Sequence, residues 1–79
     1  MEQKVFEKLV EKCAYLWGVD ADTITPDTTF EEHGTKSVQI SQMTTFLEDE
    51  FDCEVNYMQF KRNKTLGEAA AFVAELLDE

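Results

Sequence analysis

Apolar residues recur at helical spacing in three stretches of the chain, and this pattern constrains its fold more than any other feature. From Glu2 to Trp17 they recur at steps of three and one residues and share one side of a helix: Phe6, Leu9, Val10, Cys13, Leu16 and Trp17. Nowhere does the alternation of a half-buried strand persist for more than a few residues. We therefore predict an all-α fold, with Gly18 ending the first helix.

Two further main helices and one short helix complete the predicted bundle. A helix is expected from about Ser37 to Phe51, with Val38 and Phe46 flanking a buried side made of Ile40, Met43, Leu47 and Phe51. The last helix follows a capping box, in which the Thr65 hydroxyl accepts from the N–H of Glu68 and the Glu68 carboxylate accepts from the N–H of Thr65. Its apolar residues are Leu66, Ala69, Ala70, Phe72, Val73, Leu76 and Leu77. The stretch from Cys53 to Asn63 is long enough for the short helix.

A long loop separates the first two helices. Residues Val19 to Lys36 are dense in Asp, Thr, Pro and Gly, which favour turns. We expect a helical turn near Thr29 to Glu32 and anchoring by Ile24 and Phe30, with Phe30 in the core. Loops of this length inside a compact domain tend to be functional.

Size and charge restrict the function. A chain of 79 residues has room for one hydrophobic core, so we predict a single domain over residues 1–79, without a deep catalytic site. Seventeen acidic and seven basic residues give a net charge of −10, which repels nucleic acids and anionic membranes. The expected partners are basic proteins, although charge of this kind can also serve solubility alone.

No membrane span, secretory signal, metal site or disulfide is expected. No stretch is apolar for the ~18 residues that a span requires, and the N-terminal residues lack the basic-then-apolar order of a signal. Cys13 and Cys53 stand forty positions apart without a CxxC motif, and His33 is the single histidine. We expect a cytoplasmic monomer with reduced cysteines.

Two segments carry a family resemblance. The stretch from Phe30 to Val38, followed by Leu47 to Val55, resembles free-standing acyl carrier proteins. In that family a Phe, a Gly and an Asp-Ser-Leu triplet precede a helix that ends in Leu-Glu-Glu-Glu-Phe and an acidic-Ile/Val step. Thr65 to Ala69 falls where the family opens its last helix, so the resemblance covers essentially the whole chain.

The resemblance implies a covalent 4'-phosphopantetheine arm on Ser37. A phosphopantetheinyl transferase would move it from coenzyme A, and the arm's thiol would carry acyl groups for fatty acid or related lipid or polyketide synthesis, with no catalysis by the chain itself. A serine at a helix start is by itself usually only a cap. The first turn of a helix also favours a phosphodiester, because its N–H groups are unpaired. Gly34, Lys36 and Val38 complete the expected attachment segment.

Two further sets of residues follow from the resemblance. An attached chain could be sheltered among the helices by Val38, Ile40, Met43, Leu47, Phe60, Ala69 and Phe72, for which plain core packing is the alternative description. Acyl-transferring or condensing enzymes with basic docking patches are expected to contact Gln39, Gln42, Glu48, Asp49 and Glu50.

The chain departs from the family pattern beside Ser37. Lys36 stands where the family usually has Asp, and Val38 where it usually has Leu. Lys36 would repel basic side chains of a transferase, or neutralise the phosphodiester once it is made. The first half of this helix also lacks acids, which favours a carrier for a narrower pathway over the general fatty-acid carrier.

Two other functions stay open. One is an unmodified acidic adaptor that kept the carrier fold. The other is still a phosphopantetheine carrier, but one for aminoacyl or peptidyl groups. An enzyme is disfavoured, because one histidine and no nucleophile–base spacing leave nothing for acid–base or covalent chemistry.

Overall fold

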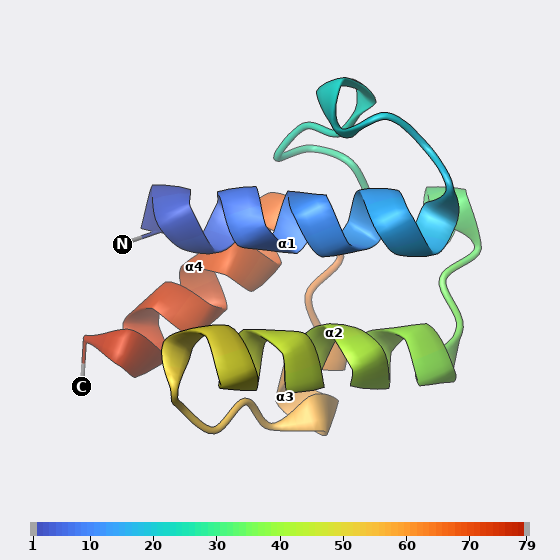
Figure 1. Cartoon of the computed structure of the whole chain (residues 1–79). Coiled ribbons are helices and arrows are strands. Elements are labelled where there is room, and N and C mark those ends of the chain that lie inside the picture. Colours follow the sequence, from blue (N-terminus) through green and yellow to red (C-terminus); the bar gives the residue numbers. More distant parts are fainter. Residues whose placement is uncertain (1, 79) are drawn as a thin grey trace.

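The computed structural model describes residues 2–78 of the chain. These residues fold into four α-helices and two short 3₁₀ helices (Figure 1). The elements are α1 (Glu2–Trp17), η1 (Ala21–Thr23), η2 (Glu31–His33), α2 (Ser37–Phe51), α3 (Tyr57–Lys61) and α4 (Leu66–Leu77). The described residues contain no strand. The predicted all-α fold, with three long helices, one short helix and a long first loop, is confirmed.

The helices α1 and α2 lie side by side and run in opposite directions, so the end of α1 is close to the start of α2 (Figure 1). Helix α4 crosses the first half of α1 and makes the most extensive helix–helix contact of the bundle. The short helix α3 packs against α2. The long loop passes over the end of α1 and delivers the chain to Ser37.

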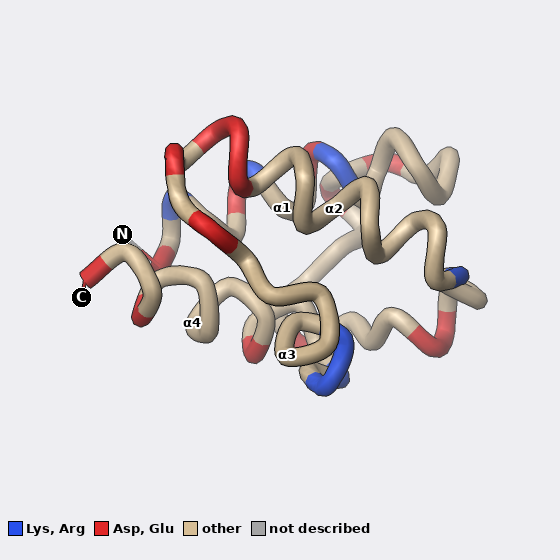
Figure 2. The backbone as a smooth tube through the Cα atoms, turned by 90° about the horizontal axis from the view of Figure 1, so that it is seen from below, with Lys and Arg blue, Asp and Glu red and all other residues tan. Residues whose placement is uncertain are grey.

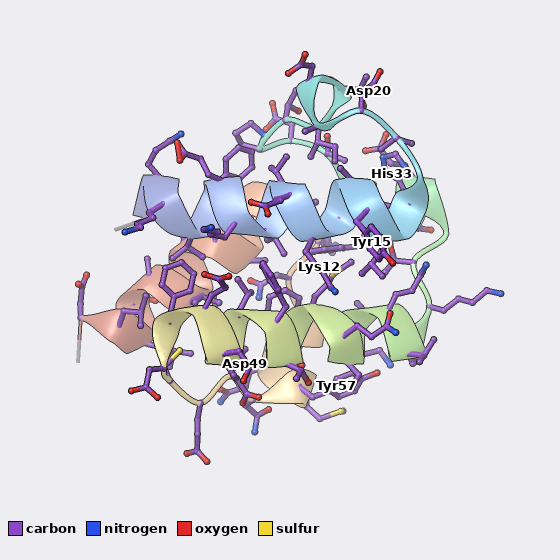
Figure 3. The ribbon with its side chains drawn as sticks, viewed as in Figure 1. Lys12, Tyr15, Asp20, His33, Asp49 and Tyr57 are labelled. Carbon is purple, nitrogen blue, oxygen red and sulfur yellow. The ribbon has the colours of Figure 1, made fainter. Side chains whose placement is uncertain are left out.

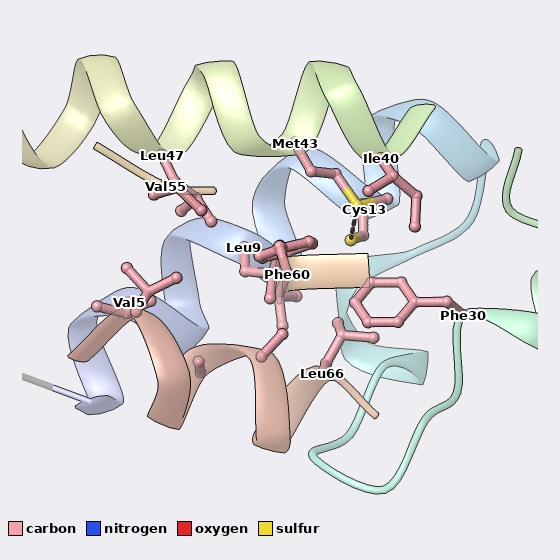
Figure 4. Packing of buried hydrophobic residues seen from close by; sticks show 14 of the residues in the cluster. Val5, Leu9, Cys13, Phe30, Ile40, Met43, Leu47, Val55, Phe60 and Leu66 are labelled. Carbon is pink, nitrogen blue, oxygen red and sulfur yellow. Dashed lines mark hydrogen bonds between the residues drawn. The ribbon is translucent and has the colours of Figure 1, made fainter. Parts of the chain in front are cut away.

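The core is a continuous apolar cluster to which all four α-helices contribute (Figure 4). The fully buried side chains include Val5, Leu9, Cys13, Met43, Leu47, Phe60, Leu66, Ala69 and Val73. The predicted apolar side of α1 packs on the core. Leu9, Val10 and Cys13 are buried, and Phe6, Leu16 and Trp17 are half-buried against the core. Val5, which the prediction did not include, is fully buried. Phe51, expected on the buried side of α2, is also half-buried because the helix ends there.

Two threonine–glutamate pairs cap helical turns. The Thr65 hydroxyl accepts from the N–H of Glu68 at 3.1 Å, as predicted, but the Glu68 carboxylate accepts from the N–H of Lys64 at 2.9 Å instead of that of Thr65. In the loop, the N–H of Glu32 donates to the Thr29 hydroxyl at 3.1 Å and the N–H of Thr29 donates to the Glu32 carboxylate at 2.6 Å. The Thr29 side chain therefore caps η2, and the helical turn expected near Thr29 to Glu32 is observed at Glu31–His33.

The loop is fastened at its two predicted anchors, Ile24 and Phe30. Ile24 and Phe30 are both 6% exposed, which confirms their predicted anchoring role. Thr29 pairs with Thr65 in an antiparallel bridge, with the N–H of Phe30 donating to the Lys64 carbonyl at 3.2 Å. The single turn η1 has no counterpart in the sequence prediction.

Candidate functional site

Ser37 is the first residue of α2 and is exposed. The preceding Lys36 takes the extended conformation of an N-cap, with φ −96° and ψ 162°. Ser37 is therefore inside the first turn, and its hydroxyl makes no hydrogen bond to any residue between 2 and 78. The side chain is free for chemistry instead of serving as the helix cap.

The backbone around Ser37 presents unpaired donors. The N–H groups of Gln39 and Ile40 both donate to the Lys36 carbonyl at 3.0 Å, and the N–H of Lys36 donates to the Gln39 side-chain oxygen at 2.9 Å. Within the described part of the chain, the N–H groups of Ser37 and Val38 have no partner. They form the positive end of the helix, which stabilises a nearby anion.

The segment that delivers Ser37 is clamped to the end of α1. The Trp17 indole N–H donates to the Thr35 hydroxyl at 3.0 Å, and that hydroxyl donates to the Phe30 carbonyl at 2.7 Å. The Trp17 ring stacks on the His33 ring with centroids 4.0 Å apart and 6° between their planes. Gly34 follows with φ 61°, a left-handed conformation that suits glycine. Sequence reasoning missed Trp17, His33 and Thr35 as parts of the site.

Five of the seven predicted shelter residues share the interior. Ile40 is 7% exposed, and Met43, Leu47, Phe60 and Ala69 are fully buried. The other two lie elsewhere. Val38 is 61% exposed, and Phe72 is half-buried beside a separate surface groove with Gln59 and Leu76.

A groove of about 390 Å³ opens beside the first turn of α2. Its lining joins the loop, α2 and the end of α3, and consists of Thr29, Phe30, Glu31, Thr35, Ile40, Lys61, Asn63 and Lys64. Ile40 is the predicted shelter residue that lines it. Ile40 follows Ser37 by three residues, so the two lie on neighbouring positions of one helix side.

The predicted partner-binding residues divide into exposed and structural ones. Gln42 and Asp49 line a second groove, of about 360 Å³, between α1 and α2, where Lys12 lies between the two helices (Figure 3). Glu50 is exposed, with a carboxylate oxygen 3.9 Å from the Lys8 ammonium nitrogen. Gln39 is half-buried and occupied as a cap, as described above.

Glu48 has a structural bond that the sequence did not suggest. It is half-buried, and its carboxylate accepts from the N–H of Val55 at 2.9 Å. This bond ties the end of α2 to the segment that leads into α3. Glu48 is therefore less available to a partner than Asp49.

A family model described as the phosphopantetheine attachment site matches residues 7–73. The chain belongs to this family. Its members carry covalently attached 4'-phosphopantetheine, so the chain is a phosphopantetheine carrier, whose partners include a transferase and acyl-handling enzymes. The matched range contains Ser37 and the whole of the long loop.

The residues of the carrier at the start of α2 fit such a group. A phosphodiester needs an accessible hydroxyl for its ester bond and donors for its charge. Among residues 2–78 the exposed Ser37 hydroxyl has no partner, and the N–H groups of Ser37 and Val38 are unpaired. The residue directly before Ser37 is the positively charged Lys36. When bound, the group supplies a terminal thiol that holds acyl groups as thioesters.

The two cysteines of the carrier do not offer a competing thiol of similar reactivity. Burial raises the pKa of the Cys13 thiol to about 12, and its sulfur lies 3.9 Å from that of Met43. Burial, followed by the charges of Glu48 and Asp52, raises the pKa of Cys53. Both thiols are therefore mainly protonated and poorly nucleophilic near neutral pH.

Residues 2–78 contain neither a metal-binding cluster nor a membrane-spanning helix. No three His, Cys, Asp or Glu side chains are grouped so that they could hold a metal ion. None of the described helices has the length and apolar character needed to cross a membrane.

Proposed function

We propose that Ser37 is the attachment point and that residues 1–79 form a single acyl carrier domain. The observation that carries this proposal is the exposed, unbonded Ser37 hydroxyl at the first turn of α2, within the range matched by the family model. A phosphopantetheinyl transferase supplies the group from coenzyme A, and the chain itself performs no catalysis. The cargo is an acyl intermediate of fatty acid synthesis or of a related specialised lipid or polyketide pathway.

The positive first turn of α2 stabilises the phosphodiester in this proposal. Within the described residues the N–H groups of Ser37 and Val38 are unpaired, and the exposed Lys36 directly precedes Ser37. Helix N-termini stabilise an adjacent anion by roughly 0.3–1 kcal/mol when exposed. The same Lys36 charge disfavours transferases whose docking surface is basic, so the cognate transferase must be neutral or acidic at the position that faces Lys36.

Partner enzymes with basic patches bind the other end of α2. Asp49 and Glu50 are exposed there, and Gln42 lies nearer to Ser37 on the groove between α1 and α2. Exposed α2 side chains in the helix's first half, such as Ser41 and Gln42, are uncharged. This distribution favours a carrier dedicated to a narrower pathway, because general basic docking patches would find fewer carboxylates close to the serine.

Intact-mass analysis tests the attachment site. The chain is incubated with coenzyme A and a broad-specificity phosphopantetheinyl transferase, and the wild type should gain one phosphopantetheinyl increment. Ser37→Ala should gain none, whereas Ser41→Ala, an exposed serine one turn later, should gain it as the wild type does. An increment that persists in Ser37→Ala would place the attachment elsewhere. No increment with any transferase would favour the unmodified adaptor.

A further inference from the structure

We propose that the groove beside Ser37, between the loop, α2 and the end of α3, binds the far end of an acyl cargo that terminates in a carboxylate. The proposal rests on the proposed function, because the cargo reaches the groove only from an arm on Ser37. It narrows the cargo from acyl groups in general to anionic ones.

The floor of the groove suits the methylene carbons of such a cargo. Phe30 and Ile40 line it and are 6% and 7% exposed, so both present limited apolar surface at the bottom of a space of about 390 Å³. Burial of methylene groups on such a surface is favourable, because it removes apolar area from water. A short acyl chain can therefore be held there, but the floor alone does not choose between a methyl and a charged end.

The rim supplies that choice, because it carries two lysines without a carboxylate partner. Lys61 and Lys64 both line the groove and are exposed, and neither forms an ion pair with any residue between 2 and 78. Lys8 on α1 is different, since its ammonium nitrogen lies 3.9 Å from carboxylate oxygens of both Glu11 and Glu50. Figure 2 shows the basic residues at the end of α3 as one stretch, apart from most of the acidic positions.

The other polar groups of the rim are largely occupied. The Thr35 hydroxyl donates to the Phe30 carbonyl, the Thr29 hydroxyl lies 3.3 Å from the Glu32 carboxylate, and the Asn63 side-chain N–H donates to the Phe60 carbonyl. The charged donors of the rim are therefore the ammonium groups of Lys61 and Lys64, of which that of Lys61 lies 5.9 Å from the centroid of the Tyr57 ring. An ammonium group recognises an anion better than a neutral amide or hydroxyl does.

The groove differs in charge from the chain as a whole. With a net charge of −10, an added carboxylate is disfavoured over most of the surface. In the groove Lys61 and Lys64 outnumber the single acid, Glu31, and Arg62 lies between them in sequence. A carboxylate on the cargo should therefore stabilise the protein if it binds in this groove and should not stabilise it if it lies elsewhere on the surface.

Two cargoes of equal length provide the test. The wild type is loaded from glutaryl-coenzyme A or pentanoyl-coenzyme A by the broad-specificity transferase, and intact mass confirms the loading before and after each melt. We expect the glutaryl form to have a Tm about 1–4 °C above that of the pentanoyl form. The difference should disappear in Lys61→Met/Lys64→Met and persist in Lys4→Met, a change to an exposed lysine outside the groove lining.

The outcomes separate the two proposals. Failure of Ser37 to load would overturn the proposed function. Successful loading with equal Tm values, with a lower Tm for the glutaryl form, or with a difference that survives in the double lysine variant would overturn the groove proposal alone. Salt at about 1 M screens the charges and should reduce the Tm difference between the glutaryl and pentanoyl forms, whereas Glu31→Gln should increase that difference. Backbone amide shifts of Asn63 and Lys64 that change more with glutaryl than with pentanoyl would locate the contact at the groove.

Discussion

Replacing Trp17 with Phe tests how the loop is held in front of Ser37. The change removes the indole N–H that donates to the Thr35 hydroxyl at 3.0 Å, and it shortens the ring that stacks on His33 at 4.0 Å. It keeps an aromatic ring in place to pack near Phe30, whose ring centroid lies 6.3 Å away. The substitution therefore removes the clamp with little change to the core.

The expected loss of stability follows from these contacts. A hydrogen bond of this kind contributes about 0.5–1.5 kcal/mol net, and an aromatic pair about 0.5–1.5 kcal/mol beyond its area, of which phenylalanine retains a part. We expect a decrease of about 1–2 kcal/mol in the free energy of unfolding. For a domain of this size that corresponds to a fall in Tm of about 4–16 °C.

A double-mutant cycle with Thr35→Val isolates the clamp, with unfolding followed by circular dichroism in urea. The valine removes the acceptor of the Trp17 N–H and also the bond to the Phe30 carbonyl. The two changes together should cost at least about 0.5 kcal/mol less than the sum of the single changes. Tyr15→Phe, on the exposed side of the same helix, should change stability by less than about 0.5 kcal/mol. Additive effects in the cycle, or a Trp17→Phe variant as stable as the Tyr15 control, would refute the clamp.

The remaining predictions concern backbone conformation, capping and thiol chemistry. Gly34→Ala should destabilise by about 1–2 kcal/mol in urea unfolding, because φ is 61° there and no neighbouring atom lies within 4 Å of an added Cβ, so the cost is conformational. Thr65→Ala should cost about 1 kcal/mol in the same assay through loss of the bond from the Glu68 N–H, and Thr65→Ser should restore most of it. In native protein an alkylating reagent should modify Cys53 and leave the buried Cys13 unmodified, as mapped by mass spectrometry; equal labelling would contradict the described burial. Because the unfolded Cys13 thiol ionises near pH 9.0 and the folded one near about 12, the folded chain binds more protons between these values, so unfolding free energy should fall in that window by up to about 1.4 kcal/mol per pH unit, with a shallower slope in Cys13→Ala.

The sequence predicted the three long helices because each has its own local signal. Apolar spacing marked α1 and α2, and the Thr65–Glu68 pair marked the start of α4. The prediction for α1 left out Val5, because Val5 and Phe6 are both apolar and only packing against α4 and α2 decides that Val5 is the more deeply buried of the two. Local pattern cannot choose between two such neighbours.

The site was predicted at Ser37 but not in its surroundings. The Trp17–His33 stack joins residues sixteen positions apart across the loop, and no periodic signal connects them. Val38 was expected among the shelter residues on the basis of its apolar side chain, yet its exposed position follows from the direction in which α2 is rotated against the core. The groove beside Ser37 depends on where the end of α3 meets the loop, which is a tertiary property.

The acidic end of α2 links these features physically. Acids at a helix C-terminus oppose its dipole at a cost of about 0.3–1 kcal/mol each. Glu48 offsets that cost through its hydrogen bond from the Val55 N–H, since a bond to a charged group contributes about 1.5–3 kcal/mol. The same bond fixes the segment that leads into α3, and the end of α3 brings Lys61 and Lys64 to the groove. Glu50 has a contact of another kind, since its carboxylate oxygen lies 3.9 Å from the Lys8 ammonium nitrogen. Asp49 forms no hydrogen bond or ion pair through its side chain within residues 2–78, which agrees with its proposed use by partner enzymes.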